Sequence, residues 1–170
     1  MSMTDQNDNP QTNGSSDETS ENPATGEFRV LGQYIKDLSF ENPKAPMSLQ
    51  NLDDKPTLNV EVNVNARKLG DDTYESAIDF KAQAKSNDEV IYNLETVYSG
   101  VFRIAGIPDN MLQPMLLINC PSILFPFLRR IIADLTREGG YPPLLLDPID
   151  FAGLYTTRME QAQAEGQAAS

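Results

Sequence analysis

The residues that could carry chemistry in this 170-residue chain are few, and the most suggestive is its single cysteine. Cys120 lies in the apolar stretch NCPSILFPF, residues 119–127, which also contains two prolines. A cysteine nucleophile needs a nearby base or an electropositive pocket to stabilise the thiolate. The chain has no histidine, so an imidazole base is absent and a Cys/His zinc site cannot be assembled within one chain. We therefore expect Cys120 to be a buried core or interface residue.

Paired carboxylates are the other candidates for chemistry. Asp147 and Asp150 could be read as an acid/base pair, as in a carboxylate hydrolase. They flank Pro148 before an expected helix, however, where carboxylates commonly cap the first turn. The Asp pairs at 53–54 and 71–72 indicate turns, because a calcium loop needs regularly spaced oxygen ligands. No glycine loop of the GxGxxG or GxxxxGK[ST] type is present. The sequence predicts no catalytic residue, metal or cofactor, and the chain is predicted not to be an enzyme.

The charge balance restricts the partners. The chain has 25 acidic and 13 basic residues, which gives a formal net charge of −12. Nucleic acid and anionic membrane surfaces attract clustered Lys and Arg, so neither is an expected partner, and a basic protein surface is favoured. No uninterrupted apolar run reaches the ~20 residues of a membrane span, and the N-terminus lacks the pattern of a secretory signal. With one cysteine, these features predict a cytoplasmic protein without direct membrane insertion.

Composition divides the chain into three parts. Residues 1–26 contain no aromatic or branched aliphatic side chain, so they are predicted to form a disordered acidic N-terminal extension. Residues 27–160 carry the periodic apolar patterns of one folded domain. Residues 161–170 are small and polar and are predicted to be a flexible C-terminal tail.

Alternation of apolar and polar residues predicts four strands. The clearest pattern has Leu58, Val60, Val62 and Val64 on one face and polar residues on the other. Short turns at 70–72 and 86–88 predict antiparallel hairpins, whereas residues 41–56, with three prolines, form a long irregular connection. The strands are expected at residues 27–40, 57–69, 74–85 and 90–104, in a sheet with one solvated face.

From Pro108 onward the period changes to that of a helix. Asp109 or Asn110 is the expected N-cap of a helix entered at Met111, and the glycines at 139–140 are expected to end it. The prolines at 121 and 126 predict a kinked helix or two helical pieces. A second helical stripe starts at Phe151, with Asp150 as its expected cap. The expected fold class is therefore α+β: a four-stranded antiparallel sheet followed by a long kinked helix and a shorter C-terminal helix.

The first part of the long helix is apolar on nearly every side, and such helices are buried. One sheet cannot cover it, so self-association is the simplest way to bury it. The residues concerned are Met111, Leu112, Met115, Leu116, Leu117 and Ile118.

Four stretches together resemble the SecB protein-export chaperone family over roughly residues 27–160. They are YIKDLSFENPKAP (34–46), SGVFRIAGI (99–107), NCPSILFPF (119–127) and YPPLLLDPIDFAGLY (141–155). The combination of CPxILFP with a later PxLxLxPxxF is specific to this family, and the acidic extension lies outside the resemblance.

The resemblance implies the same α+β fold and a homotetramer, a dimer of dimers with the long helices packed between sheets. It implies an ATP-independent cytoplasmic chaperone, or holdase, that keeps newly made precursor proteins unfolded and delivers them to the SecA motor for export. In this family, acidic residues on the sheet dock the basic zinc-binding C-terminal tail of SecA. The matching residues here are Asp37, Glu41 and Glu95.

The resemblance also implies apolar grooves that bind unfolded precursor proteins, for which Met and aromatic side chains are well suited. Four of the candidates could serve assembly instead: Tyr92, Leu94, Thr96 and Tyr98. An alternative function is an oligomeric adaptor or peptide-binding module for one specific protein partner. The client-binding or assembly candidates are Phe40, Met47, Leu49, Leu52, Tyr92, Leu94, Thr96 and Tyr98.

Overall fold

The computed structural model describes residues 26–50 and 56–168. Most of the predicted N-terminal extension, the candidate Leu52 and the Asp pair at 53–54 therefore lie outside the described residues. Four long strands form one antiparallel sheet in the order β1-β4-β3-β2. The strands are β1 (Glu27–Glu41), β2 (Thr57–Gly70), β3 (Thr73–Ser86) and β4 (Glu89–Ala105).

The strands form where the period-2 pattern predicted them, with bounds within about one residue. The β2–β3 turn has Asp72 at φ 53°, and the β3–β4 turn has Asn87 at φ 50° and Asp88 at φ 65°. Asn and Asp tolerate this left-handed region better than other non-glycine residues, which explains their place in both turns. The connection after β1 contains a short 3-10 helix, Met47–Leu49.

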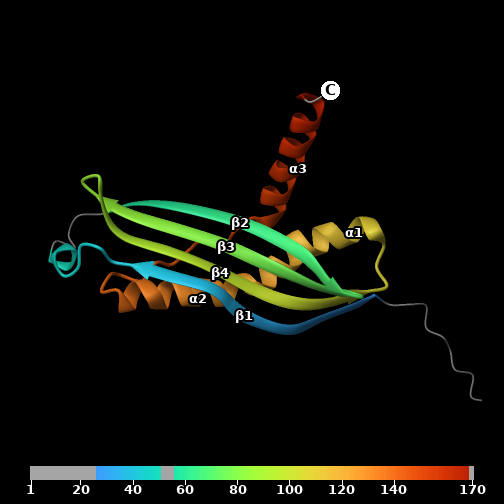
Figure 1. Ribbon diagram of the computed structural model, residues 1–170, viewed down its shortest axis with the longest axis horizontal. Coiled ribbons are helices and arrows are strands. Elements are labelled where there is room, and N and C mark those ends of the chain that lie inside the picture. The colour runs from blue at the N-terminus through green and yellow to red at the C-terminus, as the bar shows by residue number, and fades with distance from the viewer. Residues whose placement is uncertain (1–25, 51–55, 169–170) are drawn as a thin grey trace, which may run out of the picture.

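One long helical segment, Asp109–Glu138, covers one face of the sheet (Figure 1). It consists of α1 (Asp109–Pro114), a π-helical turn (Met115–Asn119) and α2 (Cys120–Glu138). The expected cap at Asp109 or Asn110 is wrong, because the helix already begins at Asp109 and Pro108 precedes it without a side-chain cap. Gly139 and Gly140 end α2 as expected, with Gly140 at φ 89°.

The π-helical turn shows how the helix accommodates Pro121. The backbone N–H of Cys120 bonds the carbonyl of Met115, five residues earlier. Such a widened turn is a known way to relieve the missing N–H and the ring clash of a proline. Pro126 lies inside α2 itself. The sequence predicted a kinked helix or two helical pieces at these prolines, and the structure has one helical segment with a π-helical turn ahead of Pro121.

The long helix is apolar and long enough to cross a membrane by length and composition alone, although the sequence contains no uninterrupted apolar run of that length. The core helix of a globular domain passes the same test. Here its buried row packs on β3 and β4, with Cys120, Leu124, Leu128 and Ile132 all fully buried. These side chains meet Ile78, Phe80, Leu94 and Phe102 of the sheet in one hydrophobic core.

The last helix, α3 (Phe151–Ala168), projects away from the sheet (Figure 1). The Asp150 carboxylate accepts a hydrogen bond of 2.9 Å from the N–H of Gly153, as expected for a cap. Phe151 is buried against the core, but most of the rest of the helix is exposed. Because α3 continues to Ala168, the predicted tail boundary after residue 160 does not coincide with the end of a helix.

Candidate functional site

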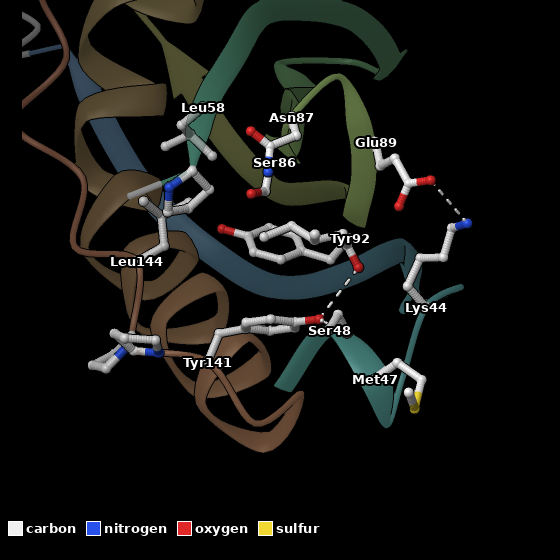
Figure 2. Close-up of a pocket in the computed structure, with 14 residues that line it drawn as sticks. Lys44, Met47, Ser48, Leu58, Ser86, Asn87, Glu89, Tyr92, Tyr141 and Leu144 are labelled. Atoms are coloured by element: carbon white, nitrogen blue, oxygen red, sulfur yellow. Dashed lines mark hydrogen bonds and ion pairs between the residues drawn. The ribbon is translucent and has the colours of Figure 1, made fainter. Parts of the chain in front are cut away.

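A pocket of about 510 Å³ opens at the end of the sheet where the connection after β1 meets the segment after α2. Tyr92 and Tyr141 form its wall, with ring centroids 5.0 Å apart and ring planes at 46°. Met47 lies at one side and Leu58 and Leu144 at the other, as Figure 2 shows. The volume is within the range of ligand-binding pockets, and the lining is largely apolar and aromatic.

Hydrogen bonds fix the two segments that enclose the pocket. The Tyr141 hydroxyl donates to Asn42 Oδ1 at 2.7 Å and lies 2.8 Å from Ser48 Oγ, whose proton it can accept. The Asn42 side-chain amide donates to the carbonyl of Gly139 at 3.0 Å. These bonds attach the connection after β1 to the end of α2. The pocket is therefore preformed rather than assembled from unattached loops.

The polar groups of the pocket offer little for catalysis. Lys44 and Glu89 pair across its rim at 3.5 Å, as Figure 2 shows. Burial raises the pKa of Tyr92, and the neighbouring Tyr141 adds to this effect, so Tyr92 stays protonated near neutral pH. The arrangement suits binding of apolar side chains rather than proton transfer.

An exposed apolar row extends from this pocket along β2. Leu58 and Val60 are 37% and 41% exposed although their side chains point to the helix side of the sheet. A second hollow of about 440 Å³ continues the row, lined by Val60, Val62 and Leu154. We name Leu58, Val60 and Val62 together with these two hollows the β2 groove.

The backbone of β2 faces outward along this groove, because β2 is an edge strand. Arg158 Nη1 of α3 donates to the carbonyl of Val64 at 2.8 Å. Alternate residues of an antiparallel edge strand direct their N–H and C=O to the same side. The carbonyls of Val62, Val60 and Leu58 therefore point away from β3 like that of Val64. Among the described residues, Arg158 is bonded to one end of this strand edge, and no hydrogen bond is found to the outward carbonyls of Leu58, Val60 and Val62.

The three predicted acidic docking residues lie together on the opposite, open face of the sheet. Glu95 of β4 stands opposite Ser39 of β1. Asp37 and Glu41 flank Ser39 two residues away on either side, so all three carboxylates share this face. Glu95 pairs with Lys81 of β3 at 3.5 Å.

A buried carboxylate lies on the same open face. Glu75 of β3 is 2% exposed and accepts hydrogen bonds from the Tyr34 hydroxyl, Lys36 Nζ and Arg67 Nε. Burial opposes its ionisation, but the hydrogen bonds from Tyr34, Arg67 and Lys36 outweigh burial and lower the pKa of Glu75 to about 2. Glu75 is therefore ionised at neutral pH and joins side chains from β1, β2 and β3.

The client-binding or assembly candidates fall into two groups. Met47 and Tyr92 line the pocket, and Phe40 and Leu49 pack behind its tyrosines. Leu94 and Thr96 are 0% and 1% exposed in the core, so a single protomer presents no surface from either. Tyr98 is also buried, and its ring stacks on the half-exposed Phe127 of α2 at 6.5 Å.

Sequence reasoning missed Tyr141, Leu58 and Val60 as candidate site residues. Tyr141 follows the two glycines that end the helix and precedes two prolines. An aromatic residue in such a restricted, non-helical segment could have indicated a residue that lines a pocket. The alternation of β2 had been interpreted only as a core face.

The helix-facing side of β1 carries a row of exposed apolar side chains. The long helix packs on β3 and β4 and leaves the edge strand β1 open. Phe127 of α2, 49% exposed, continues this surface. The exposed side chains of β1 on this side are Phe28, Val30, Ile35 and Leu38, between 36% and 45% exposed.

Cys120 is fully buried in the core, as expected for a structural cysteine. Desolvation raises the pKa of its thiol to about 12, so the thiolate does not form near neutral pH. Asp150 caps α3, which supports the capping interpretation over an acid/base role. Within residues 26–50 and 56–168, no group of three His, Cys, Asp or Glu residues is arranged to hold a metal ion.

Comparison with known proteins gives consistent matches. The family model described as "Preprotein translocase subunit SecB" matches residues 20–162. "Protein-export protein SecB" of Rhodopseudomonas palustris strain TIE-1 is 46% identical over 144 residues, which cover 85% of this chain and 92% of that protein. The protein of the same name from Bradyrhizobium sp. strain BTAi1 is 48% identical over 155 residues, covering 91% and 94% of the two chains.

A solved structure has the same fold. It is a SecB-like chaperone from Mycobacterium tuberculosis in complex with a ChAD peptide from an antitoxin, with a TM-score of 0.60. The match covers 72% of this chain and 91% of that chain at 14% sequence identity. At this identity the likeness shows the fold alone.

Proposed function

This chain belongs to the SecB family and is a chaperone for preprotein export, and we propose that it acts in the cytoplasm as an ATP-independent holdase. In this proposal it binds newly made precursor proteins while they are unfolded and delivers them to SecA. It carries out no catalytic reaction of its own. The protein alone, without nucleotide, is then sufficient to keep a precursor unfolded.

The observation that carries the proposal is the β2 groove, which includes the pocket walled by Tyr92 and Tyr141. Leu58 and Val60 expose apolar side chains beside a strand edge with outward-facing backbone groups. An extended, unfolded segment can pair with such an edge and place alternate apolar side chains into the hollows. A folded partner has few extended apolar segments to offer. The geometry therefore fits unfolded precursor proteins without requiring one particular sequence.

Charge supports the same class of client. The chain carries a formal net charge of −12, which favours encounter with polypeptides that carry basic residues. Lys44 and Glu89 already neutralise each other at the pocket rim, so the pocket itself does not select strongly by charge. Selection is expected to rest on apolar content and lack of structure.

The test is to mix the full chain, without nucleotide, with several unrelated polypeptides kept unfolded by chemical modification. Suppressed aggregation of most of them supports the holdase. Capture of one protein only, and only in its folded form, would favour the adaptor function and contradict the proposal.

We propose further that Asp37, Glu41 and Glu95 dock the basic zinc-binding C-terminal tail of SecA. Their common position on the open face supports this, because clustered carboxylates attract a cationic segment. The open face lies on the other side of the sheet from the β2 groove, so client and motor can bind at the same time. Docking is then expected to weaken as salt increases.

Charge reversal tests this docking. Asp37→Lys combined with Glu95→Lys is expected to abolish binding of a zinc-loaded SecA tail peptide. Asp71→Lys, in the β2–β3 turn at the far end of the sheet, is the control and should retain binding. Unchanged binding by the double variant would show that the docking assignment is wrong.

We also propose a homotetramer built as a dimer of dimers. The uncovered apolar side of β1 supports it, because such a row at a sheet edge is normally covered in a stable protein. Phe127 of the neighbouring helix α2 extends the same apolar surface. Ile35→Asp with Phe127→Asp should lower the mass measured by light scattering to that of a smaller oligomer, and an unchanged mass would contradict this interface.

A further inference from the structure

A hollow of about 410 Å³ lies on the open face of the sheet, beside the proposed docking residues. Asp37 of β1 and Asp79 of β3 both line it, and so do Lys36 and Arg67. Glu75, buried beneath these side chains, also contributes to the lining. Two cations and three carboxylates therefore share one small region.

A β-bulge brings one of the cations there. The register of β1 shifts between Ile35 and Asp37, so Lys36 is an extra residue without a partner in β4. In a regular strand, Lys36 and Asp37 would point to opposite faces. The bulge lets both side chains reach the same hollow. Lys36 and the Asp37 carboxylate therefore line one hollow although they are adjacent in sequence.

Glu75 forms ion pairs with both cations. Lys36 Nζ lies 3.1 Å and 3.2 Å from the two Glu75 oxygens, and Arg67 Nε donates to the same carboxylate. Asp37 and Asp79, by contrast, take part in no ion pair within the described part of the chain. The pairing therefore leaves the exposed Asp37 and the partly exposed Asp79 without an ion-pair partner in the described part of the chain, although two cations line the hollow.

We infer that Glu75 is a positioning residue for partner docking: it sequesters Lys36 and Arg67 and so keeps the hollow between Asp37 and Asp79 free for a basic side chain of the partner. The inference rests on the proposed docking of a cationic segment at Asp37. It adds Asp79 as a second carboxylate for that segment. Glu75 acts only through the two cations and does not contact the partner.

The physical reason is competition for the same carboxylates. If Glu75 is made neutral, Lys36 and Arg67 lose their buried counter-ion and can pair with the other acids that line the hollow, Asp37 and Asp79. Each such pair must be broken before a partner's lysine or arginine can bind. Ion pairs at a surface are individually weak, so the expected effect of two of them is about threefold to tenfold in affinity.

The experiment measures binding of a fluorescent, zinc-loaded peptide with the sequence of the basic SecA tail to the full chain. Glu75→Gln is expected to weaken binding about threefold to tenfold. Glu61→Gln makes the same charge change elsewhere on the open face and is expected to have less than about half this effect. Adding Lys36→Gln and Arg67→Gln to Glu75→Gln is expected to restore binding to within about twofold of the original chain.

Rescue separates positioning from a structural role. If Glu75 only stabilised the sheet, removing its partners too would not restore binding. If net charge alone mattered, Lys68→Gln with Lys85→Gln would rescue Glu75→Gln equally well. Either result would overturn the inference, as would unchanged binding by Glu75→Gln. Failure of the proposed docking itself is distinguishable, because the original chain would then not bind the peptide at all, or the Asp37→Lys, Glu95→Lys variant would bind it normally.

A second comparison applies if Glu75→Gln does not fold. In the otherwise unchanged chain, Lys36 is already sequestered, so Lys36→Gln should alter peptide binding no more than Lys85→Gln. Binding that tightens clearly more for Lys36→Gln would show that Lys36 competes for Asp37 even in the presence of Glu75, and would contradict the inference.

Discussion

The rings of Tyr92 and Tyr141 lie with their centroids 5.0 Å apart, which joins the inner strand β4 to the segment that follows the long helix. Phe40 of β1 also stacks on Tyr92, with ring centroids 5.7 Å apart. The wall of the pocket thus combines three parts of the chain that are distant in sequence. Its integrity depends on the hydrogen bonds that hold Tyr141 in place.

Replacing Tyr141 by Phe should lower the free energy of unfolding by about 1–2 kcal/mol, because the hydroxyl bonds to Asn42 and Ser48 are lost inside a partly buried network. Urea unfolding measures this. Tyr155→Phe is the matched control, since no hydrogen bond of its hydroxyl is found within the described residues, and it should change stability by less than about 0.5 kcal/mol. Equal effects of the two variants would show that the Tyr141 hydroxyl does not anchor the pocket.

Stability should fall in acid because of Glu75. Its folded-state pKa of about 2 lies below its ordinary value of 4.5, so its contribution is complete above about pH 4.5 and is lost as the pH falls toward about 2. Each pKa unit corresponds to about 1.4 kcal/mol, but Lys36 and Arg67 are 44% and 62% exposed, and solvent screens them. The contribution is therefore on the order of 1–3 kcal/mol.

Urea unfolding of the original chain and of Glu75→Gln, near pH 7 and near pH 3, checks this dependence. The stability difference between the two proteins should be larger near pH 7. Glu160→Gln, on the exposed part of α3, should show no such difference at either pH. A gap for Glu75→Gln that stays constant with pH would contradict the assignment.

Gly100 of β4 allows α2 to approach the sheet closely. A Cβ at this position would lie 2.7 Å from Leu124 Cδ2 and 2.7 Å from the Phe102 ring. Gly100→Ala should therefore destabilise the fold by about 1–3 kcal/mol through overpacking. Gly32→Ala in β1, where the added Cβ meets nothing within 4 Å, is the control and should be close to neutral. Thermal unfolding measures the stability of both variants. An unchanged stability of Gly100→Ala would show that the helix can move away from the added methyl group and would contradict this prediction.

Cys120 should not react with a maleimide while the protein is folded, because its thiol is buried and its pKa is raised to about 12. In concentrated urea it should react at the rate of an ordinary exposed thiol. Mass spectrometry measures the labelled fraction over time. Rapid labelling of the folded protein would contradict the structural role of this residue.

The strands could be predicted from sequence because their signal is local. Val60 and Val62 alternate with polar neighbours, and the turn before β3 carries Gly70 and two aspartates. The start of the long helix and its irregular turn were harder to place, whereas its end at Gly139 was predicted correctly. Its start depends on Pro108, and its irregular turn depends on how the chain relieves Pro121. The helix start and the irregular turn both depend on the pattern of backbone hydrogen bonds, which the residue types permit but do not determine.

The location of the uncovered apolar surface could not be predicted from periodicity alone. The sequence suggested that one protomer could not bury the apolar first part of the long helix. Leu116 and Leu117 are nevertheless buried, whereas Met111 is 48% exposed. The exposed row lies instead on β1, because the helix packs on β3 and β4. The order of strands in a sheet is a long-range property, and the alternation within a single strand does not encode it.

The candidate site likewise combines features that the sequence predicts with features that only the fold determines. The three acidic docking candidates were named from a family resemblance, and the register then placed them on one face. The position of Tyr141 in the pocket depends on hydrogen bonds to Asn42 and Ser48, which are more than 90 residues away in the sequence. Sequence patterns identify faces of single elements, whereas a pocket between elements requires the fold.

The most direct measurement of the central claim is the affinity of the full chain for an unfolded precursor after Val60→Asp. Val60 is 41% exposed in the β2 groove, and Leu69, 46% exposed near the far end of the same strand, provides the control Leu69→Asp. A charge in the groove should weaken capture about tenfold or more, because a carboxylate cannot be desolvated against apolar side chains at low cost. Leu69→Asp should bind nearly as well as the original chain. Equal affinity of both variants for the unfolded precursor, with the oligomer intact, would contradict the groove as the binding site.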